Sequence, residues 1–563
     1  MEKIIECVPN FSEGNNQQII KEITNAIESA GGIKLLNVDP GKATNRTVVT
    51  FVGPPDDVVE AAYRGIKKAS ELIDMAQHKG EHPRFGATDV CPLVPIANIS
   101  MEETVEYANK LAERVGRGLG IPVYCYEFAA KNVNRQSLAN CRSGEYEALK
   151  ERIASKEWKP DFGPSVWSAS VAKSGAIAIG ARNFLVAYNI NLNTTSTRRA
   201  NAIAFDVREA GRIKRAGDPV TGEVVKDENG EPARIPGTLK KVRAIGWYIK
   251  EYGIAQISMN LADITVTPVH IAFDEVCEKA RLRGVRVTGS ELVGVIPLSA
   301  MLDAGRYFLK KQKRSVGIAD EEVIKIAVKS LGLDELAPFN PEERIIEYLI
   351  EGPAQGKLIN MGLKEFVNET ASESPAPGGG SVSAYIGSVG AALGTMVANL
   401  SANKRGWGSR WEEFSDWAEK GKYYHDALLK CVDEDTQAFK NIMAASGLPK
   451  STDTEKAKRR QAIAEATRYA IEVPLKVMRL SLGSMAVMKA MAETGNPNSV
   501  SDAGVGALCA RAAVEGAYLN IKINAKGFDG LPFLDKVFQE AESILENARA
   551  GEKRILAIVY NHF

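Results

Sequence analysis

The sequence has few of the residues from which disulfide frameworks and zinc sites are built. Its seven cysteines are scattered over 563 residues, are odd in number and show no CxxC spacing. We therefore expect neither kind of site and a reducing, cytoplasmic environment. The first residues, MEKIIECV, lack the long apolar stretch and cleavage site of a signal peptide.

An excess of either charge is also absent. The chain has 71 Lys and Arg against 70 Asp and Glu, a formal net charge of +1. Binding to nucleic acids or membrane surfaces draws on a basic excess, so we expect neither partner. Hydrophobic residues make up 45% and charged residues 25%, as in a globular protein, and the length predicts two or three domains.

Long hydrophobic runs are scarce, with one exception at residues 382–400. This segment, VSAYIGSVGAALGTMVANL, carries no charge and is about long enough to span a bilayer. It is rich in Gly, Ala and Ser, and no aromatic or basic anchors flank both ends. We predict a buried helix of a bundle.

The first ~330 residues alternate strand-like and helix-like runs. Strands are expected at 3–8, 33–38, 46–53 and 89–96, with helices at 16–30 and 56–73. A similar order follows, with strands at 184–192, 242–249, 254–261 and 291–298 and helices at 195–210 and 268–283. Each order is β-α-β-β-α-β, which predicts two ferredoxin-like split β-α-β subdomains, residues 1–178 and 179–330, with a groove between them. Residues 212–236 have the Gly and Pro content of an exposed hairpin or loop.

The remaining sequence loses its strand signals. Residues 331–356 include three prolines within LAPFNPEERIIEYLIEGPAQG and predict a linker with a short helix. Residues 357–563 predict an all-α helical bundle. Its helices are expected at 382–402, 410–445, 454–482, 482–493, 502–523 and 534–560.

Histidine is rare, and two of the five histidines lie in MAQHKGEHPRFGATDVCPL. Gly80 and Pro83 prevent this segment from continuing the preceding helix, so His82 is expected on a loop, where catalytic groups are commonly presented. Imidazole is suited to proton transfer near neutral pH. The structural alternative is a loop histidine that caps the local backbone.

Two further groups of residues suggest a ligand site in the first half. Asp39, Asn45 and Arg46 lie between two apolar strands, so their side chains should gather at strand ends. The alternative for each residue taken singly is a purely structural role. The run DFGPSVWSASVAKSGAIAIGARNF is rich in Gly, Ser and Ala. It predicts either a close wall against a flat ligand or a plain interdomain connection; its candidate residues are Gly163, Pro164, Ser165 and Gly175.

In the second half, Gly378, Gly379 and Gly380 precede a long helix. Glycines there allow an anion to approach free backbone N–H groups, although they also occur for packing. Asp435 continues an apolar stripe that includes Val432 and Phe439.

A carboxylate at a stripe position is expected to be buried. Burial raises a carboxyl pKa and suits it to proton exchange, unless an Arg or Lys pairs with it. Asp433 lies nearer the flank of the same helix and stays open as an alternative to Asp435.

Together these motifs resemble a known family. ECVPNFSEG, DPGKATNRTV, FVGPP, GEHPRFGATDVCP, PDFGP and GWYI resemble glutamate formiminotransferase. APGGGSVSA, VDEDTQAF, SDAGVGA and EGAYLNIKIN resemble formiminotetrahydrofolate cyclodeaminase. Their order resembles the fused formimidoyltransferase-cyclodeaminases.

The resemblance implies a two-step folate chemistry. It implies transfer of a formimino group from N-formimino-L-glutamate to tetrahydrofolate, then cyclisation to 5,10-methenyltetrahydrofolate with release of ammonia. His82 would be the transferase's catalytic residue, Asp435 would serve the cyclodeaminase, and residues 163–176 would contribute to the folate site. It further implies a cytosolic homo-oligomer, polyglutamylated tetrahydrofolate as substrate, and no metal.

Two other functions stay open. One is a folate-binding scaffold without turnover. The other keeps the transferase and gives the helical half a cyclohydrolase-like activity.

Overall fold

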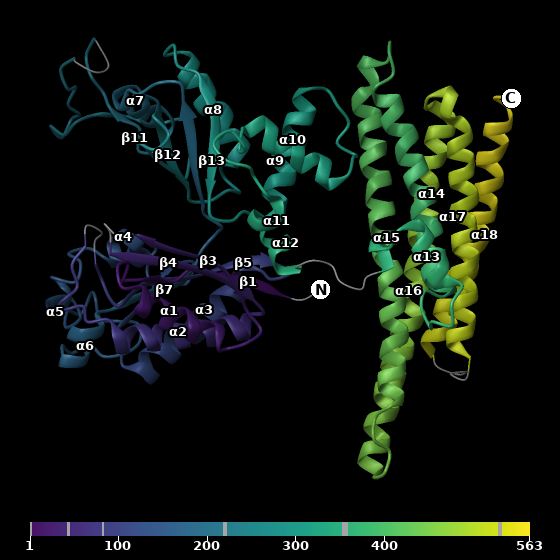
Figure 1. Ribbon diagram of the computed structural model, residues 1–563, viewed down its shortest axis with the longest axis horizontal. Coiled ribbons are helices and arrows are strands. Elements are labelled where there is room, and N and C mark those ends of the chain that lie inside the picture. The colour runs from purple at the N-terminus through teal and green to yellow at the C-terminus, as the bar shows by residue number, and fades with distance from the viewer. Residues whose placement is uncertain (1–2, 42–44, 81–83, 218–221, 352–357, 527–531) are drawn as a thin grey trace. The chain divides into compact units, whose positions relative to one another are not determined.

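The computed structural model describes residues 3–41, 45–80, 84–217, 222–351, 358–526 and 532–563 (Figure 1). The chain divides into two compact units, which are treated separately below. The first comprises Met1–Ala304 and Leu331–Gly352, and the second Gly305–Ser330 and Pro353–Phe563. The protein is therefore α/β in its first half and all-α in its second, as predicted. The borders expected after residues 178, 330 and 356 stay predictions.

Seven strands form the first sheet, in the order β3-β4-(β1, β2)-β5-β7-β6, where β1 and β2 are two segments lying between the same neighbours. Strands β5, β7 and β6 run parallel and the others antiparallel. Their bounds are β1 Ile4–Cys7, β2 Asn10–Phe11, β3 Lys34–Gly41, β4 Arg46–Gly53, β5 Thr88–Ala97, β6 Val123–Glu127 and β7 Ile177–Ala181. The predicted order accounts for β1 to β5, whereas β6 and β7 extend the sheet beyond it.

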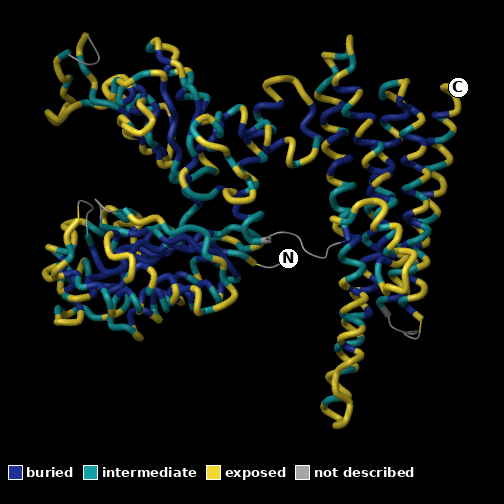
Figure 2. Tube along the Cα trace, viewed as in Figure 1, coloured by how far each residue is buried: buried dark blue, intermediate teal, exposed yellow. Residues whose placement is uncertain are grey.

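The parallel part of this sheet is buried on both faces. Val123 and Ile177 belong to the core shared with α1 (Gln17–Glu28), α2 (Pro55–Leu72) and α3 (Met101–Leu119). The next residues, Tyr124 and Ala178, point to the opposite face and a second core. That core is formed with the short helices α4 (Leu138–Cys141), α5 (Leu149–Arg152) and α6 (Ala169–Ser174). Most residues of these strands are buried, as the dark blue centre of the sheet in Figure 2 shows. This is expected of parallel strands covered on both faces.

Four antiparallel strands form the second sheet, in the order β11-β12-β8-β13. Their bounds are β8 Val186–Leu192, β11 Val242–Ile249, β12 Ile254–Leu261 and β13 Val287–Val293, with helices α7 (Thr197–Val207) and α8 (Val269–Arg281). The last strand was predicted at 291–298. It ends instead before Gly294, which has a positive φ of 83°. Residues 212–236 contain the paired segments β9 (Arg212–Ile213) and β10 (Arg234–Ile235), in agreement with the predicted hairpin.

Helices connect the sheets to the bundle along the chain: α9 (Leu298–Lys311), α10 (Asp320–Leu331), α11 (Pro341–Arg344), α12 (Ile346–Glu351), the 3-10 turn η2 (Leu358–Asn360) and α13 (Leu363–Thr370). Residues of the predicted linker contact the second sheet and the segment after it. The Ser290 hydroxyl donates to Leu331 O at 2.7 Å, and Ile345 forms a parallel bridge with Ile296.

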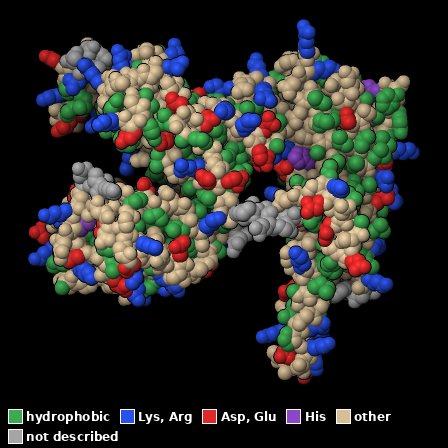
Figure 3. All heavy atoms as spheres, in the orientation of Figure 1, with side chains coloured by type: hydrophobic (Ala, Val, Ile, Leu, Met, Phe, Trp, Pro, Cys, Tyr) green, Lys and Arg blue, Asp and Glu red, His purple; other side chains and the backbone are tan. Residues whose placement is uncertain are grey.

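Five long helices make up the bundle: α14 Gly379–Ala402, α15 Trp411–Ser446, α16 Asp453–Thr494, α17 Val500–Ala525 and α18 Pro532–Tyr560. The hairpin of α15 and α16 extends well beyond the other helices (Figure 1). Close helix contact depends on small residues, since a methyl group on Gly390 would lie 2.8 Å from Gly506 O of α17. The face drawn in Figure 3 mixes Lys and Arg with Asp and Glu side chains.

Two expectations about these helices have clear outcomes. The split predicted at Leu482 is wrong, because α16 runs unbroken through Gly483, whose missing side chain leaves room for the Tyr424 ring. Among the described helices, α14 alone is long and apolar enough to cross a membrane, and 61% of its most apolar window is buried inside the bundle. This burial agrees with the predicted bundle helix.

Candidate active sites

Asn45 joins the start of β4 to two loops. Its positive φ of 48° is one that asparagine tolerates. Its side-chain oxygen accepts from Gly14 N–H and Asn15 Nδ2, each at 2.9 Å, and its Nδ2 donates to Lys79 O at 2.8 Å. His78 Nε2 lies 3.0 Å from the Asn45 carbonyl. Asn45 therefore fixes the loop directly before residues 81–83, although His82 itself lies outside the described residues.

Arg46, the next residue, shares a buried carboxylate with a second arginine. The Asp89 side chain is 2% exposed; Arg46 Nη2 lies 3.1 Å from it, and Arg142 donates to the same oxygen. Burial lowers the pKa of Arg46, while Asp89 opposes this shift and Arg142 adds to it. Two guanidinium groups thus converge on one carboxylate, and guanidinium groups bind carboxylates in bidentate fashion.

Asp39 lies exposed on the edge strand β3. It is in register with Val48, two residues beyond Arg46 on β4. Alternate residues of a strand share a face, so Asp39 and Arg46 lie on the same side of the sheet. The predicted cluster of Asp39, Asn45 and Arg46 is thus brought to one strand end.

Gly175 is also brought to this region. It forms a bridge with Gly86, whose carbonyl accepts from the Ser12 hydroxyl at 2.7 Å. Its φ is +66°, and a methyl group there would lie 2.4 Å from Phe85 O. Only glycine fits both the backbone angle and this close approach.

Gly163 packs against a different element. Its φ is +82°, and an added methyl group would lie 2.2 Å from Ile121 O, just before β6. Pro164 and Ser165 follow it and are half-buried. Among the described residues, no hydrogen bond joins these three residues to the Arg46 cluster, so their place in a folate site stays a prediction.

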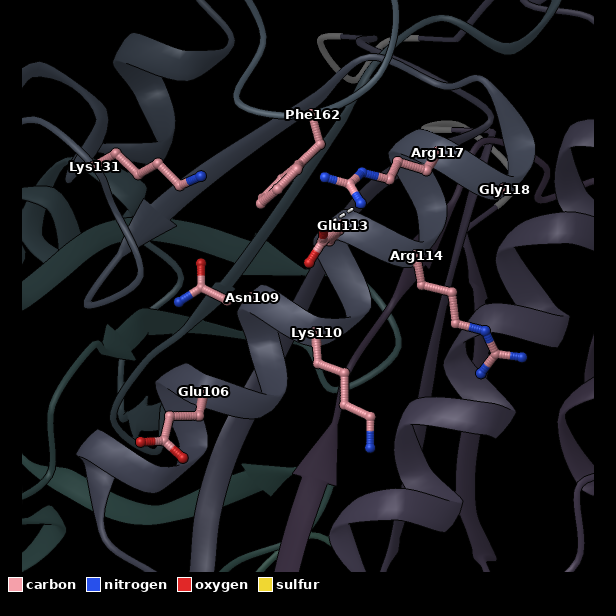
Figure 4. Close-up of a pocket in the computed structure, with 9 residues that line it drawn as sticks. All are labelled: Glu106, Asn109, Lys110, Glu113, Arg114, Arg117, Gly118, Lys131 and Phe162. Carbon is pink, nitrogen blue, oxygen red and sulfur yellow. Dashed lines mark ion pairs between the residues drawn. The ribbon is translucent and has the colours of Figure 1, made fainter.

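One cavity on α3 contains none of the predicted site residues. It has a volume of about 910 Å³ on the outer face of α3 (Figure 4), lined by Glu106, Asn109, Lys110, Glu113, Arg114, Arg117, Gly118, Lys131 and Phe162. Arg117 pairs with Glu113 at 2.8 Å and Arg114 with Glu60 at 2.6 Å. These exposed pairs describe a solvated helix face.

In the helical half, three consecutive acids on α15 have three different environments. Asp433 accepts from Leu358 N–H at 2.8 Å, so it anchors η2. Glu434 pairs with Lys476 of α16, with both oxygens within 2.9 Å of Nζ. Asp435 has no cation within salt-bridge distance among the described residues. Asp433 and Glu434 thus have structural partners, whereas Asp435 has no charged partner among the described residues.

Asp435 lies against the first turn of α14. A methyl group on Gly380 would lie 2.1 Å from Asp435 Oδ1, so this glycine makes the approach possible. The Ser381 hydroxyl donates to Asp435 Oδ2 at 2.9 Å. Burial raises the pKa of Asp435, and hydrogen bonds from the Ser381 hydroxyl and backbone N–H oppose that shift. The carboxyl is therefore placed to exchange protons nearer neutral pH than an exposed aspartate.

The three glycines before α14 contribute unequally. Gly378 and Gly379 are exposed, Gly380 is buried, and the N-cap Gly378 has no side chain to cap the helix. Asp435 provides that cap from another helix. Over the described ranges, no three His, Cys, Asp or Glu side chains gather as a metal site. The expectation that the protein needs no metal stays a prediction.

Comparisons with known proteins match both halves. Residues 4–182 match the family of the N-terminal subdomain of the formiminotransferase domain. Residues 187–351 match the formiminotransferase domain family, and residues 362–543 match the formiminotransferase-cyclodeaminase family. The formimidoyltransferase-cyclodeaminase of Gallus gallus is 44% identical over 560 residues, covering 99% of each chain. This chain belongs to the formimidoyltransferase-cyclodeaminase family. The resemblance read from the sequence motifs is confirmed.

Each half of the chain is also similar to proteins that consist of that half alone. A glutamate formimidoyltransferase of Thermoplasma acidophilum is 42% identical, covering 54% of this chain and 92% of its own. A methenyltetrahydrofolate cyclohydrolase of Methylorubrum extorquens is 38% identical, covering 36% of this chain and 96% of its own. The fusion therefore joins two units that also occur separately.

Proposed function

We propose that this chain is a bifunctional folate enzyme that carries out two consecutive reactions. It transfers the formimino group of N-formimino-L-glutamate to tetrahydrofolate, and it then closes 5-formiminotetrahydrofolate to 5,10-methenyltetrahydrofolate with loss of ammonia. This activity links histidine degradation to one-carbon metabolism. The observation that carries the proposal is the match to a bifunctional relative across 99% of both chains.

In the transferase reaction, N5 of tetrahydrofolate bonds to the formimino carbon, and the bond from that carbon to the glutamate nitrogen breaks. The proton lost from N5 must reach the departing nitrogen. One imidazole can accept the first proton and return it, which is the role we assign to His82 from its motif. The guanidinium groups of the Arg46–Asp89–Arg142 cluster would hold a glutamate carboxylate.

In the cyclisation, N10 bonds to the same carbon and the carbon–nitrogen bond to ammonia breaks. A protonated formimino nitrogen carries two hydrogens, so ammonia needs one more, and N10 must lose one. Asp435 can take the N10 proton as a carboxylate and deliver it to the leaving nitrogen as an acid. Its half-buried position and raised pKa support this double role.

Finer features belong to the same proposal. Polyglutamylated tetrahydrofolate and formiminoglutamate are the substrates, and the enzyme works without a metal as a cytoplasmic homo-oligomer. It has neither nucleic acid nor membrane as a partner. Both α/β subdomains are ferredoxin-like; the strand order β11-β12-β8-β13 supports this for the second.

A cyclohydrolase activity of the helical half is the second candidate, because a relative matching this half is named a methenyltetrahydrofolate cyclohydrolase. Supplying 5-formiminotetrahydrofolate alone separates the two functions. A cyclodeaminase releases ammonia and accumulates the methenyl product. A cyclohydrolase releases no ammonia and instead hydrolyses added methenyltetrahydrofolate.

A coupled assay tests the whole proposal. Formiminoglutamate and tetrahydrofolate are mixed with the enzyme, and the absorbance of the methenyl product is followed together with ammonia. A folate-binding scaffold would bind tetrahydrofolate without turnover. Replacing His82 by Ala should abolish glutamate release; a folded variant that keeps it would remove His82 from its role.

A further inference from the structure

A second side chain reaches the first turn of α14 beside Asp435. It is Asn520 of α17, whose Nδ2 would lie 3.4 Å from a methyl group on Gly379. Asp435 occupies the corresponding space at Gly380. Consecutive helical residues point about 100° apart, so the two groups flank this turn from different helices.

The hydrogen bonds of Asn520 leave its carbonyl available. Nδ2 donates to Gly516 O, one turn earlier on α17, at 2.8 Å. Among the described residues, no donor lies within hydrogen-bond distance of Asn520 Oδ1. The neighbouring Gly378 and Gly379 are exposed, so a small molecule can approach this side of the turn.

We propose that Asn520 is a substrate-positioning residue of the helical half: its Oδ1 accepts a hydrogen bond from the formimino nitrogen of 5-formiminotetrahydrofolate. This inference rests on the cyclisation proposed above. A protonated formimino group has N–H donors and no acceptor. Two acceptors, the Asp435 carboxylate and the Asn520 carbonyl, fix its nitrogen and so turn its carbon toward N10.

Asn524, one turn further along α17, provides a matched control. Its Nδ2 donates to Ala470 O at 2.8 Å. That carbonyl lacks its usual helical donor because Pro474, four residues later inside α16, has no N–H. Asn524 therefore supplies the hydrogen bond that α16 lacks at Pro474. We expect its replacement to change the stability of the bundle and not the catalytic rate.

The test compares three variants by ammonia release from 5-formiminotetrahydrofolate. Asn520→Leu removes both the acceptor and the donor and should lower kcat about 10- to 100-fold, with transferase activity unchanged. Asn520→Asp keeps an acceptor oxygen but loses the donor to Gly516; it should keep kcat within about tenfold. Its added charge should move the acidic limb of the pH profile upward. Asn524→Leu should lower Tm and leave kcat unchanged.

Two results would overturn the inference. One is Asn520→Leu turning over at the wild-type rate. The other is Asn520→Asp losing as much activity as Asn520→Leu, because the lost donor alone would then explain both. Failure of the underlying function has a different signature: the wild-type chain itself would release no ammonia.

Discussion

Two carboxylates, one in each half of the chain, have opposite environments. Asp89 in the α/β half is enclosed and bound by two guanidinium groups. Asp435 in the bundle is half-buried, and its hydrogen-bond partner is the neutral Ser381. A paired carboxylate holds its neighbours in place, whereas an unpaired one has a raised pKa and can exchange protons.

The largest expected effect concerns which bundle acid does the chemistry. Asp435→Asn should lower ammonia release about 1,000-fold, because the amide cannot carry a proton from N10 to the leaving nitrogen. Asp433→Asn is the control: it should keep the rate, because its amide oxygen can still accept from Leu358 N–H. Both rates are measured with 5-formiminotetrahydrofolate. An equal loss of ammonia release in the two variants would make Asp433 a candidate for the catalytic acid again.

The next effect tests the space that Asp435 occupies. Gly380→Ala would place a methyl group 2.1 Å from Asp435 Oδ1 and should displace the carboxylate. We expect ammonia release to fall about 100-fold, since small misplacements of catalytic groups are costly. Gly379→Ala, with its nearest contact at 3.4 Å, should cost much less. An unaffected Gly380→Ala rate would show that the observed approach is not needed.

The paired carboxylate should act on stability. Asp89→Asn removes the carboxylate charge that two half-buried guanidinium groups share, which should destabilise the first unit by about 3 kcal/mol. Calorimetry of the full chain should show one transition shifted to lower temperature, while ammonia release from 5-formiminotetrahydrofolate is kept. A shift of both transitions, or of neither, would contradict the claim that Asp89 stabilises the first unit alone.

The smallest expected effect is a pH dependence. Asp435 must be ionised to accept the N10 proton, and its pKa is raised. The acidic limb of kcat for ammonia release should therefore lie above the ordinary aspartate value of about 4. Because the folded pKa exceeds the unfolded one, Asp435 stabilises the fold at low pH and loses this contribution as pH rises through the folded pKa. Asp435→Asn should thus gain stability relative to wild type as the pH increases.

Much of this arrangement follows from local sequence patterns. The apolar stripe on α15 pointed to Asp435 because burial follows helical periodicity. Strands β4, β11 and β12 have the predicted bounds because their apolar residues and turns are local signals.

Other features depend on tertiary packing. Nothing local indicates that Arg142, 53 residues after Asp89, returns to share its carboxylate. Asn520 and Asn524 belong to one motif, EGAYLNIKIN. Asn520 faces the start of α14, whereas Asn524 donates the hydrogen bond that α16 lacks at Pro474. Helical spacing shows that both lie on one side of α17, but only the packed neighbours distinguish their roles. The split predicted in α16 shows the same limit, since Gly483 is accommodated by Tyr424 rather than ending the helix.

The most direct measurement is the protonation of Asp435 itself. Infrared difference spectra between the wild-type chain and Asp435→Asn, recorded against pH, isolate the band of the protonated carboxyl. The account predicts that this band persists clearly above pH ~4, the ordinary aspartate range. Its disappearance at or below that pH would contradict the claim that an unpaired, dehydrated acid transfers the proton in the helical half.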